Sequence, residues 1–199
     1  MIFMKPDLET REKAFFDAAA VWCNGKNGFV RLPLLGWFAY VFVRSLGDPH
    51  YQSALSLLNL GFHEIGHLLF SYFGKFMSIL GGTILETLIP LYAMFHFYRQ
   101  KDFFAVAMSF GWLSTVLFGI ARYAGDAQKM TIPLVSLSWE PTILHDWNYL
   151  LSQVGLLKHD AWVAFLFRIA GTGSMLLCFG FGGWLIVRMI LGKKTGQEG

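Results

Sequence analysis

Long apolar runs, separated by short polar or Gly/Pro-containing breaks, dominate the hydropathy pattern of this chain. A run of about 18 or more residues with few charges has the length of a transmembrane helix. Such runs cover residues 29–46, 51–73, 76–98, 103–124 and 161–191. We therefore predict an all-α fold, a polytopic integral membrane helix bundle of about five transmembrane helices.

Two stretches depart from this pattern. Residues 1–28 mix charges with aromatic and small apolar residues, and we expect an amphipathic helix that lies at the membrane interface. Residues 125–160 form a long, semi-polar loop. Its aromatic and histidine content argues against disorder, so we expect a functional loop with a short helix that Pro141 begins. Residues 29–199 are expected to form a single domain.

Composition supports a membrane location. Of the 199 residues, 55% are hydrophobic and 15% are charged, which is not the balance of a soluble domain. The net charge of +3 is too small to indicate a nucleic-acid partner. Cys23 and Cys178 are too far apart to form a metal-binding pair, and we expect no signal peptide. We expect a bacterial-type inner or plasma membrane, with the N-terminus inside, because most lysines and arginines then fall on that side.

The second apolar run contains the sequence His63-Glu64-Ile65-Gly66-His67. On a helix, histidines four residues apart project from one face, which is the spacing that two nitrogen ligands of one zinc ion need. The glutamate between them is then placed to act on a water molecule at the zinc as a general base. The alternative is a pair of helix-packing histidines. Because ionisable groups are costly in an apolar run, we favour a zinc site with Glu64 as the catalytic residue.

Further polar residues are expected near this site. Asn59 lies on the same helical face as the two histidines, and Glu86 lies within the third apolar run, where Ser78, Gly82 and Glu86 share a face. We expect Glu86 and Asn59 either to hydrogen-bond a ligating histidine or to serve as alternative ligands. Helix packing is an equally simple role for Asn59.

A catalytic zinc site needs a third protein ligand and an open fourth position. The candidates are Asp146, His145, Glu86 and Asp126, and we prefer the His145-Asp146 pair in the long loop because it would close the site from a separate element. Asp126 could instead form an exposed ion pair with Arg122 at the end of the fourth run.

The segment from Phe62 to Leu69, set in an apolar helix and followed by Gly81-Gly82, resembles the site-2 protease family of intramembrane zinc metalloproteases. The resemblance implies that His63 and His67 bind zinc together with a remote aspartate. It also implies that Glu64 activates water and that a membrane-embedded helical peptide is cut. In that family the aspartate lies in a Leu-Asp-Gly context near an Asn-Pro pair. That motif is absent here, so Asp146 and Asp126 are substitutes.

Three functions follow from these residues. The first is an intramembrane zinc metalloprotease, and the second is a zinc hydrolase that acts on a lipid amide or ester, because the same chemistry serves any polarised carbonyl. The third is a metal-ion transporter or a non-catalytic metal-binding membrane protein. We rank transport last because Gly66 and Leu68 stand where one zinc-transporter family has a proline and a second acid. The expected partners are the bilayer and a membrane-embedded peptide or lipid substrate.

Overall fold

The computed structural model describes residues 8–133 and 144–195. This part of the chain is helical and contains no β-strand, as the apolar periodicity predicts. Its elements, in order, are α1 (Leu8–Trp22), η1 (Phe29–Arg31), α2 (Leu32–Gly47), α3 (Ser56–Phe70), η2 (Ser71–Phe73), α4 (Lys75–Arg99), α5 (Phe103–Ala124), α6 (Asp146–Gln153), η3 (Leu157–His159) and α7 (Asp160–Thr195).

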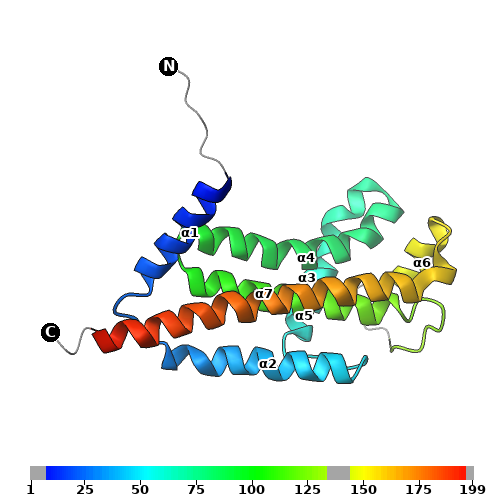
Figure 1. The fold of residues 1–199 in the computed structure, drawn as a ribbon. Coiled ribbons are helices and arrows are strands. Elements are labelled where there is room, and N and C mark those ends of the chain that lie inside the picture. The colour runs from blue at the N-terminus through cyan, green and yellow to red at the C-terminus, as the bar shows by residue number, and fades with distance from the viewer. Residues whose placement is uncertain (1–7, 134–143, 196–199) are drawn as a thin grey trace, which may run out of the picture.

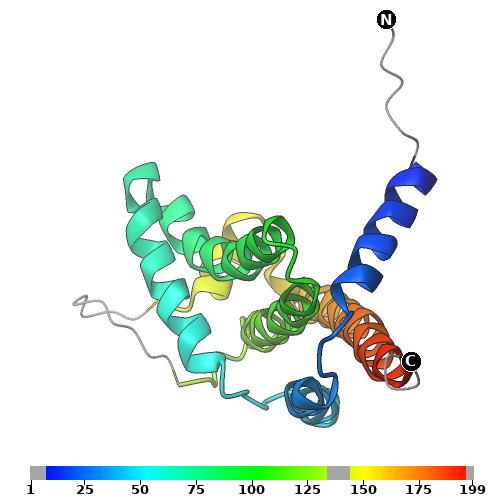
Figure 2. The ribbon, with the colours of Figure 1, turned by 90° about the vertical axis from the view of Figure 1, so that its left-hand side faces the viewer.

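Helix α5 is the centre of the bundle. It packs against α4 and along much of α7, with α2 on another side, while α3 crosses beside it (Figures 1 and 2). Small residues make this close packing possible. A Cβ atom at Gly111 would lie 2.7 Å from the ring of Phe38 in α2. Helix α5 is therefore the scaffold against which the other helices are placed.

Two apolar clusters hold the helices together. The larger joins the end of α1 to α2, α5 and α7, through residues such as Ala19, Phe38 and Met175. The smaller joins α5 to α6, where Trp147 and Leu151 are buried. The Trp147 ring also meets that of Phe167 in α7, with centroids 5.6 Å apart. The second cluster fixes the short helix α6 against the end of α5.

Four of the described helical segments are long and apolar enough to cross a membrane, which supports the expectation of a membrane protein. They are Phe29–Gly47, Lys75–Arg99, Phe103–Ala124 and Leu157–Gly192. The expected second span is shorter than predicted. Helix α3 has 15 residues, about 22 Å at 1.5 Å per residue, because residues 51–53 have no regular structure, a turn occupies 54–55 and a 3₁₀ turn follows at Ser71. The described structure thus gives four such helices instead of five.

The two expected accessory helices are present, with differences. Residues Leu8–Trp22 form helix α1, and Ala19 and Trp22 near its end pack against the bundle. Its amphipathic character and its place at a membrane interface stay predictions. The short helix of the long loop begins at Asp146, with His145 as its N-cap. Pro141, which we expected to begin it, lies outside the described residues.

Helices α3 and α4 form a tight hairpin because glycines face each other at their contact. A Cβ atom at Gly66 would collide with the backbone of Gly81, and one at Gly81 would lie 2.7 Å from the carbonyl oxygen of Gly66. Neither neighbour can move aside as a flexible side chain would. The two backbones can approach this closely only without side chains.

We predict that Gly66→Ala lowers the free energy of unfolding by about 1–3 kcal/mol, because the added methyl group must separate α3 from α4. Gly61→Ala in the same helix is the matched control. It meets no atom within 4 Å, so it should leave stability unchanged or raise it by up to about 1 kcal/mol. Unfolding in detergent, followed by circular dichroism, measures both. Equal effects of the two substitutions would show that the glycine contact does not limit the packing.

Candidate metal centre

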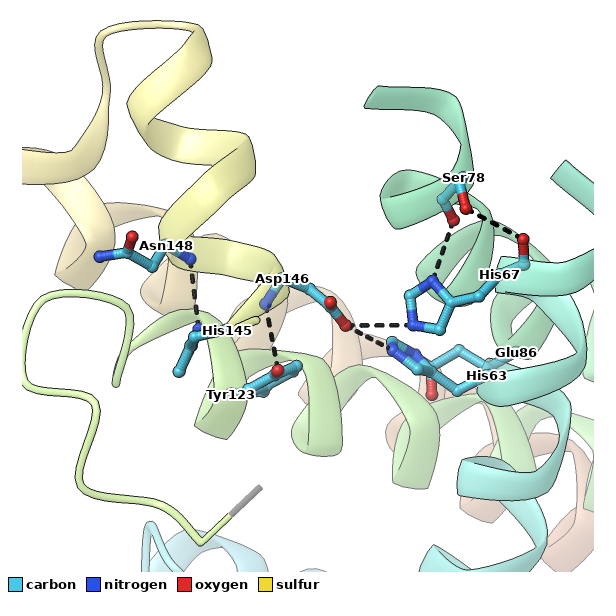
Figure 3. Close-up of polar contacts among 8 residues, drawn as sticks. All are labelled: His63, His67, Ser78, Glu86, Tyr123, His145, Asp146 and Asn148. Atoms are coloured by element: carbon cyan, nitrogen blue, oxygen red, sulfur yellow. Dashed lines mark hydrogen bonds and ion pairs between the residues drawn. The ribbon is translucent and has the colours of Figure 1, made fainter. Parts of the chain in front are cut away.

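His63 and His67 lie one turn apart on the face of α3 that meets α4, and their ring centroids are 4.6 Å apart (Figure 3). His63 is buried, whereas His67 is partly exposed. The four-residue spacing of His63 and His67 therefore does place their imidazoles side by side, as the sequence predicts. Gly82 of α4 makes room for them, because a Cβ atom there would lie 2.7 Å from Nε2 of His63.

Helix α4 holds the Nδ1 atom of each ring. His67 Nδ1 donates to the carbonyl oxygen of Ser78 at 2.9 Å, and Ser78 Oγ donates back to the carbonyl oxygen of His67 at 3.1 Å. His63 Nδ1 lies 3.2 Å from Oε1 of Glu86. Since each Nδ1 faces an oxygen acceptor, the Nε2 atoms are directed to the same side of the hairpin (Figure 3).

Asp146 reaches both Nε2 atoms from the separate helix α6. Its Oδ2 lies 2.8 Å from His63 Nε2 and 3.3 Å from His67 Nε2. In the described part of the chain, these three residues are the one group of this kind whose ligand atoms all lie within 4.8 Å of one another. Tetrahedral zinc ligands at about 2.0–2.2 Å from the ion lie about 3.3–3.5 Å apart. The 3.3 Å separation falls in that range, whereas the 2.8 Å separation is that of a direct hydrogen bond and would widen by about half an ångström around an ion. The ligand atoms, two imidazole nitrogens and a carboxylate oxygen, are of the types that bind zinc.

Contacts at the start of α6 place Asp146. Its backbone N–H donates to the hydroxyl of Tyr123 at 3.1 Å, and Asn148 Nδ2 donates to the carbonyl oxygen of Ala127 at 2.8 Å. Burial by itself would raise the pKa of the Asp146 carboxyl group, but the hydrogen bonds with His63 and His67 outweigh it and lower that pKa. The Asp146 carboxyl group is therefore held between two imidazoles by these hydrogen bonds.

The structure does not bring His145 to this group. His145 Nδ1 accepts from the backbone N–H of Asn148 at 3.2 Å, and its Nε2 lies 3.6 Å from Oδ2 of Asp126. Successive residues at a helix start point about 100° apart, so Asp146 and its neighbour cannot both face α3. His145 caps α6 instead of joining the two histidines of α3.

Asp126, the other remote candidate, is also engaged elsewhere. Its Oδ1 accepts from the backbone N–H and the hydroxyl of Thr131, and its Oδ2 accepts from the backbone N–H of Ile132. Burial by itself raises the pKa of the Asp126 carboxyl group. The hydrogen bonds from Thr131 and Ile132 lower that pKa by more, so the net shift is downward. Asp126 therefore fixes the turn that follows α5.

The remaining predicted residues take distinct positions. Glu86 contacts His63 at Nδ1, the nitrogen that faces away from Asp146. It is therefore not one of the three residues whose ligand atoms come together. Asn59 accepts from Trp112 Nε1 at 2.9 Å and donates to Thr115 Oγ1 at 3.5 Å, so its hydrogen bonds join α3 to α5. Glu64 lines the same cavity, of about 460 Å³, as His63, Glu86 and Asp146.

Sequence reasoning missed two contacts. The role of Tyr123 has no sequence signal, because it depends on α6 folding back over the end of α5. Ser78 shares a helical face with Gly82 and Glu86, and that polar stripe is the signal that could have identified it. Chemically, the assembled group can hold a cation between Asp146 and the histidines, either a metal ion or a proton on His63.

We predict that Asp126→Ala speeds hydrogen exchange at the amides of Thr131 and Ile132, because both donate to this carboxylate. Since the folded-state pKa of Asp126 is lowered, its contribution is present above the ordinary pKa of about 3.9 and is lost as pH falls through the lower folded value. Asp48→Ala is the control, because Asp48 accepts from His50 in another loop. Unchanged exchange in Asp126→Ala would contradict the assigned role.

The chain was compared with protein-family models, with curated proteins and with solved structures, and it matches none of them. The resemblance to site-2 proteases thus rests on the segment from Phe62 to Leu69 and the glycines that follow it. The geometry of His63, His67 and Asp146 is independent of that resemblance.

Proposed function

We propose that this protein is a membrane-embedded zinc-dependent hydrolase, and specifically an intramembrane metalloprotease. One observation carries the proposal: two imidazoles on one helix face, each anchored through Nδ1, direct Nε2 toward the same oxygen of Asp146. Histidines that ligate zinc are held in this way, with the second nitrogen bound to a carboxylate or a backbone carbonyl. Glu64 lies in the adjoining cavity, as a general base requires.

His63, His67 and Asp146 would hold the zinc, with Glu86 and the Ser78 carbonyl orienting the two rings. Three protein ligands leave the fourth position open, as in catalytic zinc sites. When bound, zinc supplies Lewis-acid chemistry: it polarises a carbonyl group and lowers the pKa of a water ligand to about 7.

Glu64 accepts a proton from the attacking water and returns it to the leaving amine. In this step a C–O bond and an N–H bond form, while the amide C–N bond and one O–H bond of water break. The carboxylate of Glu64 is regenerated at the end. Glu86 keeps the His63 ring in one orientation throughout, because its contact is with Nδ1 and not with the substrate side.

The other two functions remain as alternatives with weaker support. A lipid amide or ester would undergo the same reaction, and substrate tests distinguish it from a peptide. A transporter needs successive sites along a path, whereas the described residues contain one His/Asp group of this kind. For location, we propose a bacterial-type inner or plasma membrane with the N-terminus inside, on the distribution of lysine and arginine.

We predict about one zinc ion per chain in protein purified under metal-replete conditions. His67→Ala and Asp146→Ala should lose the ion, because each removes one of three ligands. His145→Ala is the matched control: it changes the adjacent residue, which faces Asp126. Elemental analysis measures all four proteins. Wild-type protein without metal, or zinc retained by Asp146→Ala and lost by His145→Ala, would refute the assigned ligands.

Glu64→Gln should keep the zinc and lower the hydrolysis rate by about 10²–10⁴-fold, because the base is removed while the ligands stay. Cleavage of fluorescently labelled unstructured proteins in detergent, beside an N-acyl amide lipid, provides the measurement. A preference for the lipid would select the second function. Full activity of Glu64→Gln on either substrate would remove Glu64 from the mechanism.

Glu86→Leu should weaken zinc binding by about 10–100-fold, because His63 Nδ1 then loses its acceptor. Glu86→Gln keeps an oxygen at the same place and should lose less. Competition with a chromogenic chelator gives both affinities. If the two variants bind zinc like the wild type, the orienting role of Glu86 is wrong.

A further inference from the structure

The cavity beside the candidate metal centre is lined both by His63 with the carboxylates Glu64, Glu86 and Asp146 and by Arg122 of α5. His63 contacts Glu86 and Asp146, whereas Arg122 contacts Gln52, and we call these two groups the two ends of the cavity. Further polar lining comes from the α2–α3 connection and the first residue of α3: Tyr51, Ser53 and Ser56. A single space of about 460 Å³ thus joins the proposed catalytic residues to a guanidinium group.

Within the described residues, Arg122 forms no ion pair with a carboxylate, although the negative charge of Asp126 is near enough to act on it. The hydrogen bonds of the Asp126 oxygens are instead with Thr131 and Ile132. The partner of Arg122 is instead a neutral amide. With the Gln52 amide oriented so that its oxygen faces the guanidinium, Oε1 accepts from both Nη atoms at 2.9 and 3.0 Å.

The guanidinium of Arg122 is half-buried and is hydrogen-bonded to a neutral amide, with no ion pair to a carboxylate of the described residues. Guanidinium has five N–H donors in a planar fork, of which Gln52 Oε1 engages two. Charges within an apolar bundle are rare and are generally paired or functional. The planar fork matches a carboxylate, which it can bind with two parallel hydrogen bonds. The end of the cavity therefore has the chemistry of a carboxylate-binding site.

The size of the space limits what can reach both ends. A volume of about 460 Å³ is that of a pocket for a small molecule or a short extended peptide segment, and it is too small for an intact transmembrane helix. The phosphodiester of a phospholipid carries one negative charge, as a carboxylate does, so charge alone does not separate the two ligands. The small volume, together with the proposed peptidase function, favours a peptide carboxylate over a phospholipid with its acyl chains.

We propose that Arg122, held by Gln52, binds a carboxylate of a peptide substrate while the scissile carbonyl lies at Glu64. The carboxylate is either a free C-terminus or an acidic side chain close to the cleaved bond. This inference rests on the proposed hydrolase function and deepens it by assigning the substrate's charge. Arg122 is then a specificity-determining residue with no part in the bond-breaking step.

Hydroxamates that carry a carboxylate at the far end test the proposal, because a hydroxamate binds zinc while the acid probes Arg122. A series of dicarboxylic monohydroxamates of increasing length is compared with the corresponding methyl esters by titration calorimetry on zinc-loaded protein. At the best length, the acid should bind the wild type about tenfold or more tightly than its ester. Arg122→Gln should abolish this preference, and Arg122→Lys should retain part of it.

Two further variants separate the role of Arg122 from general effects of losing a charge. Arg99→Gln removes an exposed arginine that lies over Phe95 at the other end of the bundle, and it should keep the full preference for the acid. Gln52→Leu removes the amide that holds Arg122 and should reduce the preference without affecting zinc content. Zinc content and melting temperature of each variant establish that it is folded.

The possible outcomes are distinguishable. If acid and ester bind the wild type equally well, the carboxylate site is wrong while the zinc hydrolase stands. If neither compound binds and the protein holds no zinc, the proposed function fails first. A phosphonate hydroxamate that binds more tightly than the carboxylate, in an Arg122-dependent manner, would assign this end of the cavity to a phosphate group and overturn the peptide carboxylate.

Discussion

The contact of one Asp146 oxygen with two imidazoles is the interaction on which the site depends. It joins α6, from the far side of a long loop, to α3, and α4 sets the orientation of both rings through Ser78 and Glu86. In an apolar bundle an unpaired carboxylate at this position would be strongly unfavourable. The packing of three helices is therefore tied to one cluster of charges.

Backbone contacts make that cluster possible. Gly66 and Gly81 let α3 and α4 approach closely, and Gly82 leaves room for the His63 ring. The same approach brings Ser78 to His67, where two reciprocal hydrogen bonds close the contact. The site is thus built on two helices whose separation cannot change without moving the rings.

The proposed zinc site and the proposed carboxylate site share one cavity, so one substrate could occupy both. The end at His63 and Glu64 would carry the reaction, and the end at Arg122 would select a substrate by charge. The lining of this cavity comes from α2, α3, α4, α5 and α6, so no single helix contains it. Its shape consequently depends on how α5 holds its neighbours.

Sequence pattern was sufficient for features that depend on local spacing. Apolar run length predicted the helical fold and four of the long helices, and the four-residue spacing of His63 and His67 predicted their shared face. It overestimated the length of α3, because residues 51–55, which are irregular or in a turn, are not separated from the helix by periodicity alone. It also placed Asp146 among the candidate ligands, without distinguishing it from His145.

Local pattern along the chain was therefore enough to predict a helical membrane-type fold and a pair of histidines with a glutamate between them. That Asp146, and not its neighbour His145, meets both rings follows from the folded structure, because it depends on how α6 docks through Trp147. The position of Tyr123 and the pairing of Arg122 with a neutral amide were decided in the same way. The physical reason is that these contacts join residues far apart in the chain, whose relative placement follows from side-chain packing and not from local periodicity.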